Sequence, residues 1–306
     1  MTPDRVGVVV VTWNAADLVR PCLTSVPADI DVVVVDNAST DDTIRVATEA
    51  RPDVQVIARD SNDGFAVAAN VGVRELATKD AVLLLNPDCR LAAGAIGQLV
   101  DALARHPRAG LVSARVRGPG GEPERHAGGR DPSLVSVAIH YLGLTRFLGR
   151  WSLYRPVSGD RDERRDWVAG TAVLARRAAV DDVGLLDESY FLYAEDHDWC
   201  RRMRERGWEV WVTPAAEAEH LRAASVSAAG PAVRRHRITS LDAYYARGHG
   251  PLATAVFRIV RVVGYGARAV AFTVAGRAMG RSGLRSRGAT YVEDTRIAAA
   301  LLRSHA

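Results

Sequence analysis

Polar side chains follow four apolar runs in the first ninety residues, and their types suit the binding of a polar ligand. A carboxylate at such a position can accept a hydrogen bond from the imide N–H of a uracil or thymine ring, while Ser39 or Thr40 can cap the next helix. The four clusters are Thr12-Trp13-Asn14, Asp36-Asn37, Asn62-Asp63-Gly64 with the later Asn70, and Asn86-Pro87-Asp88.

The runs before these clusters have the composition of strands buried on both faces of a parallel sheet. They are Val6 to Val11, Asp31 to Val35, Val54 to Ile57 and Ala81 to Leu85. Helical periodicity between them predicts helices over Ala15 to Val26, Thr40 to Ala50 and Phe65 to Ala77. The alternation predicts a doubly wound α/β fold, in which ligands bind beyond the carboxyl ends of the strands. The four clusters are therefore expected to form one site.

The second half is less regular. Residues 118–132 read as a loop or hairpin, whereas Trp167 to Ala175 and Trp208 to Val212 are strand-like. Asp196 to Arg206 predicts a helix that Gly207 ends.

An acidic cluster, Glu195-Asp196-His197-Asp198, opens this helix. A helix N-terminus stabilises an ionised carboxylate, the form that a general base requires. Asp198 precedes Arg201 and Arg202 by three and four residues and is expected to form an intrahelical ion pair. Asp196 has no such partner, so it is the better candidate base.

In combination and in this order, several stretches resemble the family 2 glycosyltransferases of the GT-A fold, in particular the bacterial rhamnosyl- and galactofuranosyltransferases. The resemblance covers roughly residues 6–226. The stretches are VVTWNA (10–15), VVDNASTD (34–41), NDGFAVAANVG (62–72), LLNPD (84–88), WVAGTAVLARR (167–177), FLYAEDHDWCRRMRERGW (191–208) and residues 220–225.

The resemblance implies a role for each cluster. Donor-nucleotide contacts fall on Thr12, Asn14, Asp36, Asn37, Asn62, Gly64, Asn70 and Asn86, and acceptor contacts on Trp167 and Gly170. The family's metal-binding Asp-x-Asp element reads Asn86-Pro87-Asp88, so Asp88 is its one carboxylate and His220 is the implied second ligand of Mg²⁺ or Mn²⁺. Asp196 would deprotonate the acceptor, with Glu195 orienting the acceptor or supporting the base.

These roles imply an inverting transfer of a sugar, rhamnose being one candidate, from a dTDP- or UDP-sugar. The acceptor is expected to be a glycan or a lipid-linked glycan of the cell envelope. A nucleotidyltransferase would need a glycine-rich basic loop after the first strand and a dehydrogenase would need G-x-G-x-x-G there, and Thr12-Trp13-Asn14 is neither. A non-catalytic nucleotide-sugar-binding protein remains the other alternative, although it would not need Asp88, Asp196 and His220.

Composition favours a cytoplasmic globular protein. The chain of 306 residues has 48% hydrophobic and 25% charged residues. Its cysteines, Cys22, Cys89 and Cys200, are too few and too scattered for a disulfide framework. The first apolar run lacks the flanks of a secretory signal, because Asp4 and Arg5 precede it and no small-residue cleavage site follows.

The positive charge lies in the tail. From Arg222 onward the chain has 14 arginines and three acidic residues, a charge of +11, so residues 1–221 carry −7 of the total of +4. We expect a catalytic domain over residues 1–226 and a basic helical extension over 227–306. Arg258, Arg261 and Arg268 fall on one arc about 80° wide at 100° per residue.

Two interpretations of this arc stay open. The arc can bind an anionic membrane at the cytoplasmic side, or it can be the solvated face of a helix packed on the catalytic domain. Apolar runs of about 20 residues without charge are missing from the sequence, which argues against a spanning helix. The tail also lacks the interleaved aromatics of a nucleic-acid-binding segment.

Overall fold

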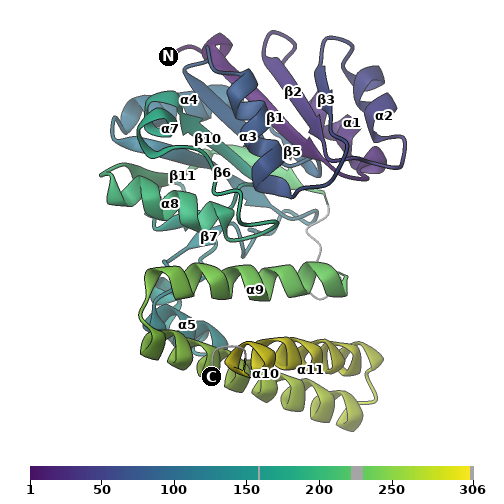
Figure 1. Ribbon diagram of the computed structural model, residues 1–306, viewed down its shortest axis with the longest axis vertical. Coiled ribbons are helices and arrows are strands. Elements are labelled where there is room, and N and C mark those ends of the chain that lie inside the picture. The colour runs from purple at the N-terminus through teal and green to yellow at the C-terminus, as the bar shows by residue number, and fades with distance from the viewer. Residues whose placement is uncertain (158, 222–229, 304–306) are drawn as a thin grey trace. The chain divides into compact units, whose positions relative to one another are not determined.

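The computed structural model describes residues 1–157, 159–221 and 230–303, which form two compact units (Figure 1). The first contains Met1–Gly129, Pro156–Phe191 and the described residues from Glu195 to Leu221. The second contains Arg130–Arg155, Leu192–Ala194 and the described residues from Gly230 to Arg303. The predicted domain boundary at residue 226 lies outside the described residues.

The first unit is built on a mixed sheet that has nine strands within the described residues, in the order β3-β2-β1-β4-β10-β6-β11-β5 with β8 paired to β11. The strands are β1 (Val6–Thr12), β2 (Asp31–Asp36), β3 (Gln55–Ala58), β4 (Ala81–Leu85), β5 (Cys89–Leu91), β6 (Ala109–Arg117), β8 (Glu163–Arg165), β10 (Ala172–Arg176) and β11 (Glu209–His220). A second small sheet pairs β7 (Gly128–Gly129) with β9 (Trp167–Val168).

The predicted α/β fold is confirmed, and β1 to β4 are parallel as expected. The other half of the sheet is mixed, because β10 runs antiparallel to both β4 and β6. The strand expected over Trp167 to Ala175 is divided into β9 and β10. These short strands belong to different sheets.

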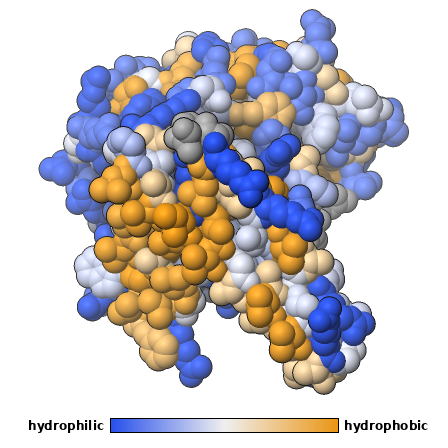
Figure 2. All heavy atoms as spheres, turned by 60° about the horizontal axis from the view of Figure 1, so that its bottom comes forward, coloured by the Kyte–Doolittle hydropathy of each residue, from blue (hydrophilic) through white to orange (hydrophobic). Residues whose placement is uncertain are grey.

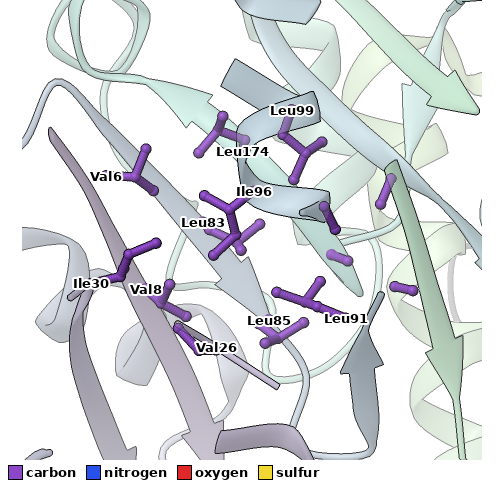
Figure 3. Packing of buried hydrophobic residues seen from close by; sticks show 14 of the residues in the cluster. Val6, Val8, Val26, Ile30, Leu83, Leu85, Leu91, Ile96, Leu99 and Leu174 are labelled. Carbon is purple, nitrogen blue, oxygen red and sulfur yellow. The ribbon is translucent and has the colours of Figure 1, made fainter. Parts of the chain in front are cut away.

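Helices of the first unit cover the sheet and bury its valine-rich strands. They are α1 (Ala16–Thr24), α2 (Thr43–Ala50), α3 (Phe65–Glu75), α4 (Ala95–Arg105), α7 (Arg177–Val183) and α8 (Glu195–Glu205), preceded by the short η1 (Pro3–Arg5). Figure 3 shows Val8 and Leu83 of the strands beside Ile96 of α4 in the core. Each such fully buried side chain contributes about 1.5–3 kcal/mol. Gly207 follows α8 with a φ of 83°, as predicted.

The second unit is helical. It contains α5 (Leu134–Tyr141), α6 (Thr145–Leu148), η2 (Gly149–Trp151), α9 (Pro231–Gly248), α10 (Pro251–Ala278) and α11 (Ser282–Arg303). Helix α10 packs against α11, α5 and α9.

The arginine arc of α10 faces the inside of this unit. Arg258 and Arg261 are 6% and 1% exposed and donate to the buried Asp242 of α9 at 2.8 and 3.4 Å. Arg268 donates to the carbonyl of His140 in α5. Both expectations that placed this arc at the surface are therefore wrong, because Asp242 and a backbone carbonyl supply partners for it inside the unit.

Candidate active site

The ends of β1 and β2 form one hydrogen-bonded network. Thr12 and Asp36 are partners in the parallel register, and the Thr12 hydroxyl donates to Asp36 Oδ1 at 2.7 Å. The Asn37 amide N–H donates to the Thr12 carbonyl at 2.8 Å. Asn14 joins the two loops, since its N–H donates to Ser39 Oγ and its Oδ1 accepts from the Thr40 N–H, each at 2.8 Å. Predicted donor residues Thr12, Asn14, Asp36 and Asn37 therefore lie together.

Asp36 is the centre of this network. Besides Thr12, it accepts hydrogen bonds from the Ser39 N–H at 2.8 Å and the Ser39 hydroxyl at 2.6 Å, and it is 1% exposed. An ionised carboxylate offers about four lone-pair sites, so three are used within the protein. One acceptor site remains for a ligand, and contact with a base stays a prediction.

Asn62 and Gly64 connect this network to the start of α3. Asn62 Oδ1 accepts the Gly64 N–H, and Asn37 Nδ2 donates to the Gly64 carbonyl, both at 3.1 Å. Gly64 has a φ of 97°, and a Cβ there would collide with the carbonyl oxygen of Phe191. The next residue, Phe65, donates its N–H to that same oxygen at 2.8 Å. Glycine lets the two segments approach this closely.

Asn70 does not join the network. Its Nδ2 donates to the Leu186 carbonyl and to Glu188, both at 2.9 Å, and its Oδ1 accepts the Leu186 N–H at 3.0 Å. The side chain is 1% exposed. These bonds fix α3 to residues 186–188 and give Asn70 a structural position instead of one at the strand ends.

Asn86 acts through its backbone in the turn that presents Asp88. Its N–H donates to the Thr171 carbonyl at 2.9 Å, and its carbonyl accepts the Cys89 N–H at 3.0 Å. Strand β5 then pairs antiparallel with the end of β11 and places His220 opposite Cys89. As a result, His220 Nε2 lies 2.9 Å from Asp88 Oδ2.

The donor atoms of Asp88, Cys89 and His220 lie within 4.8 Å of one another, as in a metal site. Burial raises the pKa of the Cys89 thiol well above its ordinary value, so the thiol stays protonated and is a poor ligand for a hard cation. A carboxylate and an imidazole remain. This pair fits Mn²⁺, which accepts oxygen and imidazole ligands.

Glu124 is a neighbour of this pair that the sequence did not indicate. Its Oε2 lies 3.5 Å from His220 Nδ1, and its Oε1 lies 3.7 Å from His126 Nδ1. Burial lowers the pKa of His220, but contacts with Asp88 and Glu124 outweigh burial and raise it to about 9. His126 and His220 hold the pKa of Glu124 far below its ordinary value.

The first turn of α8 carries the predicted base. Asp196 Oδ1 accepts the His197 N–H at 2.8 Å and lies 2.9 Å from His197 Nδ1. The His197 ring stacks on Trp167 at 3.8 Å between ring centres. Glu195 is 6% exposed, and burial together with the neighbouring Asp196 raises its pKa well above the ordinary value.

Asp198 forms the expected ion pair, with hydrogen bonds from Arg201 at 2.8 Å and Arg202 at 2.7 Å. The interpretation of this residue as structural is confirmed.

The two predicted acceptor contacts have different surroundings. Trp167 is 2% exposed and supports His197, so its ring is not an open platform for a sugar. Gly170 lines a small pocket together with Phe65, Glu195 and Asp196. Gly170 is therefore the better placed of the two for an acceptor.

Strained backbone is concentrated at these loops. Among the described residues, the non-glycine residues with positive φ are Asn14, Ala38, Tyr193 and Ala194. The first two follow β1 and β2, and the other two directly precede α8. Such strain costs about 1–3 kcal/mol per residue and clusters at functional sites.

Comparison with known proteins identifies the family of the chain. The sequence model described as glycosyl transferase family 2 matches residues 7–161. An N-acetylglucosaminyl-diphospho-decaprenol L-rhamnosyltransferase of Mycobacterium tuberculosis is 32% identical over 240 residues, which are 72% of this chain and 78% of the relative. The chain belongs to glycosyl transferase family 2. It is a glycosyltransferase.

Solved structures show the same fold. A mannosyltransferase from Pyrobaculum calidifontis in complex with GDP-Man and Mn²⁺ has a TM-score of 0.59 at 19% identity, covering 99% of this chain and 88% of that one. GalNAc-T7 with UDP, GalNAc and Mn²⁺ has a TM-score of 0.54 at 13% identity. The match covers 79% of this chain and about half, 49%, of the other. Both likenesses establish the GT-A fold.

Proposed function

We propose that the chain transfers a sugar from a dTDP- or UDP-sugar to a hydroxyl of a lipid-linked glycan, with inversion at the anomeric carbon. L-Rhamnose is the first sugar to test, because the mycobacterial relative is named for rhamnosyl transfer to a diphospho-decaprenol lipid. A lipid-linked acceptor lies in a membrane, and we propose the cytoplasmic face as the side on which the reaction takes place.

The placement of Asp196 carries the proposal. Both contacts from His197 fall on Oδ1, which orients the carboxylate and leaves Oδ2 able to accept a proton from the acceptor hydroxyl. The side chain is 18% exposed, so it is accessible to a substrate. Burial and the neighbouring Asp196 raise the pKa of Glu195, which favours its protonated form, and in that form it can donate a hydrogen bond beside the base without adding charge.

The donor would bind at the network around Asp36, with its diphosphate near Asp88 and His220. These two residues would hold Mn²⁺ or Mg²⁺, and a divalent cation there would stabilise the charge of the departing diphosphate. Two solved neighbours with Mn²⁺ at less than 20% identity support this assignment by fold alone. In a single displacement, the hydroxyl deprotonated by Asp196 attacks opposite the leaving diphosphate, which inverts the anomeric centre.

The test is Asp196→Asn, which keeps the size of the side chain and removes the proton acceptor. Donor binding is measured by calorimetry, and the chemical step by single-turnover transfer at saturating donor. We expect unchanged binding and a rate about 10²–10⁴ lower. Glu205→Gln, an exposed carboxylate at the other end of α8, is the control. Transfer by Asp196→Asn within about threefold of wild type would refute Asp196 as the base.

A further inference from the structure

Helix α10 exposes an apolar stripe on the side opposite its arginines. Six exposed residues form the stripe: Leu252, Val256, Ile259, Val263, Val270 and Val274. At 100° per residue they fall within an arc of about 60°, and Arg258, Arg261 and Arg268 lie roughly on the opposite side. Ala267, also exposed, fills the gap between Val263 and Val270. Figure 2, in which the bottom of Figure 1 comes forward, shows apolar side chains gathered on this unit.

Helix α10 thus turns its arginines into the unit and a row of valines outward, the reverse of an ordinary water-soluble amphipathic helix, although the unit also buries apolar side chains such as Phe257. Exposed fractions of 80% for Leu252, 53% for Val263 and 64% for Val270 contrast with 1% for Arg261 and 3% for Asp242. Burying charges costs free energy, and so does exposing a continuous apolar stripe to water. An apolar medium outside the unit removes the second cost.

A second apolar segment of the same unit has the same character. Leu144, Phe147, Leu148 and Trp151 lie on or directly before the short helices α6 and η2 and are 40–79% exposed. Arg150 stacks over the Trp151 ring at 5.5 Å. Tryptophan is enriched where hydrocarbon meets lipid headgroups, and an arginine beside it can interact with anionic headgroups.

Charge identifies the occupant of the stripe. The exposed residues of α10 from Pro251 to Val274 include no charged side chain, whereas exposed Arg277, Arg281 and Arg285 follow the stripe. Cations beside an apolar surface match anionic headgroups beside acyl chains. A second copy of the chain fits less well, since α10 itself contains no acidic residue, and a two-fold contact between two copies of this helix would offer Arg277 no carboxylate from the facing helix.

We infer that the apolar stripe of α10 is a membrane-contact surface, lying in the interface of an anionic bilayer. By length and composition alone α10 could also cross a bilayer. The opposite face of α10 indicates that the helix lies parallel to the bilayer surface. On that face Arg258 and Arg261 bind Asp242, and α10 packs against three other helices. The inference rests on the proposed function, because a lipid-linked acceptor gives the enzyme a reason to bind a membrane. The physical evidence for membrane contact is the exposed apolar stripe.

The test is flotation of the full chain with vesicles of phosphatidylcholine, with or without phosphatidylglycerol. The triple variant Ile259→Asn, Val263→Asn, Val270→Asn leaves the net charge unchanged and should lower the partition coefficient at least about tenfold. Val292→Asn, at a 38% exposed position of α11, is the matched control and should bind like wild type. The double variant Arg281→Gln, Arg285→Gln should bind anionic vesicles more weakly than wild type and bind neutral vesicles equally well.

Vesicle binding by the triple variant equal to that of wild type would overturn the inference. Sedimentation tests the alternative that a second copy of the chain covers the stripe. If wild type is a dimer, the triple variant is a monomer and neither floats with vesicles, the stripe is a dimer interface. Thermal unfolding and calorimetric donor binding of the variants should match wild type, because the substituted side chains are exposed. Failure of sugar transfer with intact flotation would instead refute the proposed function.

Discussion

Proton competition at His220 should make metal binding strongly dependent on pH. In the metal-free protein, contacts with Asp88 and Glu124 raise the pKa of this imidazole to about 9, and a protonated imidazole cannot bind a cation. Each pH unit below the pKa then weakens binding tenfold, so affinity at pH 7 is about 100-fold below its limit at high pH. That factor equals about 2.7 kcal/mol.

The assay is titration of the nucleotide-free protein with Mn²⁺ at pH 6, 7 and 8, reading free Mn²⁺ by electron paramagnetic resonance. The dissociation constant of wild type should fall about 100-fold across this range. His220→Asn should bind more weakly at pH 8 and show little pH dependence. Glu219→Gln, which removes an adjacent carboxylate paired with Arg90, should keep the wild-type slope.

The same shift has the opposite sign for the stability of the metal-free fold. A raised pKa means that the protonated form stabilises the native state, fully below the unfolded value of about 6.5 and progressively less as pH rises through about 9. Urea unfolding should therefore show stability falling over this window in wild type and not in His220→Asn. A wild-type Mn²⁺ affinity as flat as that of His220→Asn would refute the assignment of His220 as a ligand.

Two further substitutions test the network and the buried acid. Asp36→Asn replaces one carboxylate oxygen with an NH₂ group, which would face the Ser39 N–H or the hydroxyls of Thr12 and Ser39. We expect this change to lower the free energy of unfolding, measured in urea, by about 2–4 kcal/mol. A decrease below about 0.5 kcal/mol would contradict the structural role of the network. Because the folded pKa of Glu195 is raised, its carboxyl stabilises the fold below about pH 4.5 and loses this contribution as pH rises through the folded pKa. Glu195→Gln should thus gain stability relative to wild type toward high pH in thermal unfolding, and a difference independent of pH would contradict its burial as the cause.

Local patterns predicted the first half of the fold well. The apolar runs that became β1, β2 and β4 are buried on both faces, and composition alone indicates such strands. The Asp198 ion pair was also predictable, because its partners lie within one helical turn. The reversal at β10 was not, since nothing local determines the direction in which a strand enters a sheet.

Long-range contacts limited the prediction of the site. Glu124 meets His220 through the return of β11 to β5, and no local signal in residues 118–132 marks that partner. Asn70 matched a family stretch, yet its amide is used by Leu186 and Glu188, far along the chain. Helical periodicity predicted that the arginines and the apolar residues of α10 lie on opposite faces, but not which face is buried. The arginine face is buried because Asp242, on a different helix, binds Arg258.

The second unit combines segments that lie far apart in the sequence, so the ribosome makes them at different times. Helix α5 meets α10 through Tyr141 and Tyr265, whose hydroxyls are 3.4 Å apart across 124 residues of sequence. At about 5–20 residues per second, a ribosome needs roughly 6–25 s to make that interval. During this time the side chains of Val137, Ile139 and Tyr141, which are buried in the folded protein, cannot yet pack against α10. A nascent chain stalled before α10 would therefore be a natural client for chaperones that bind exposed apolar segments.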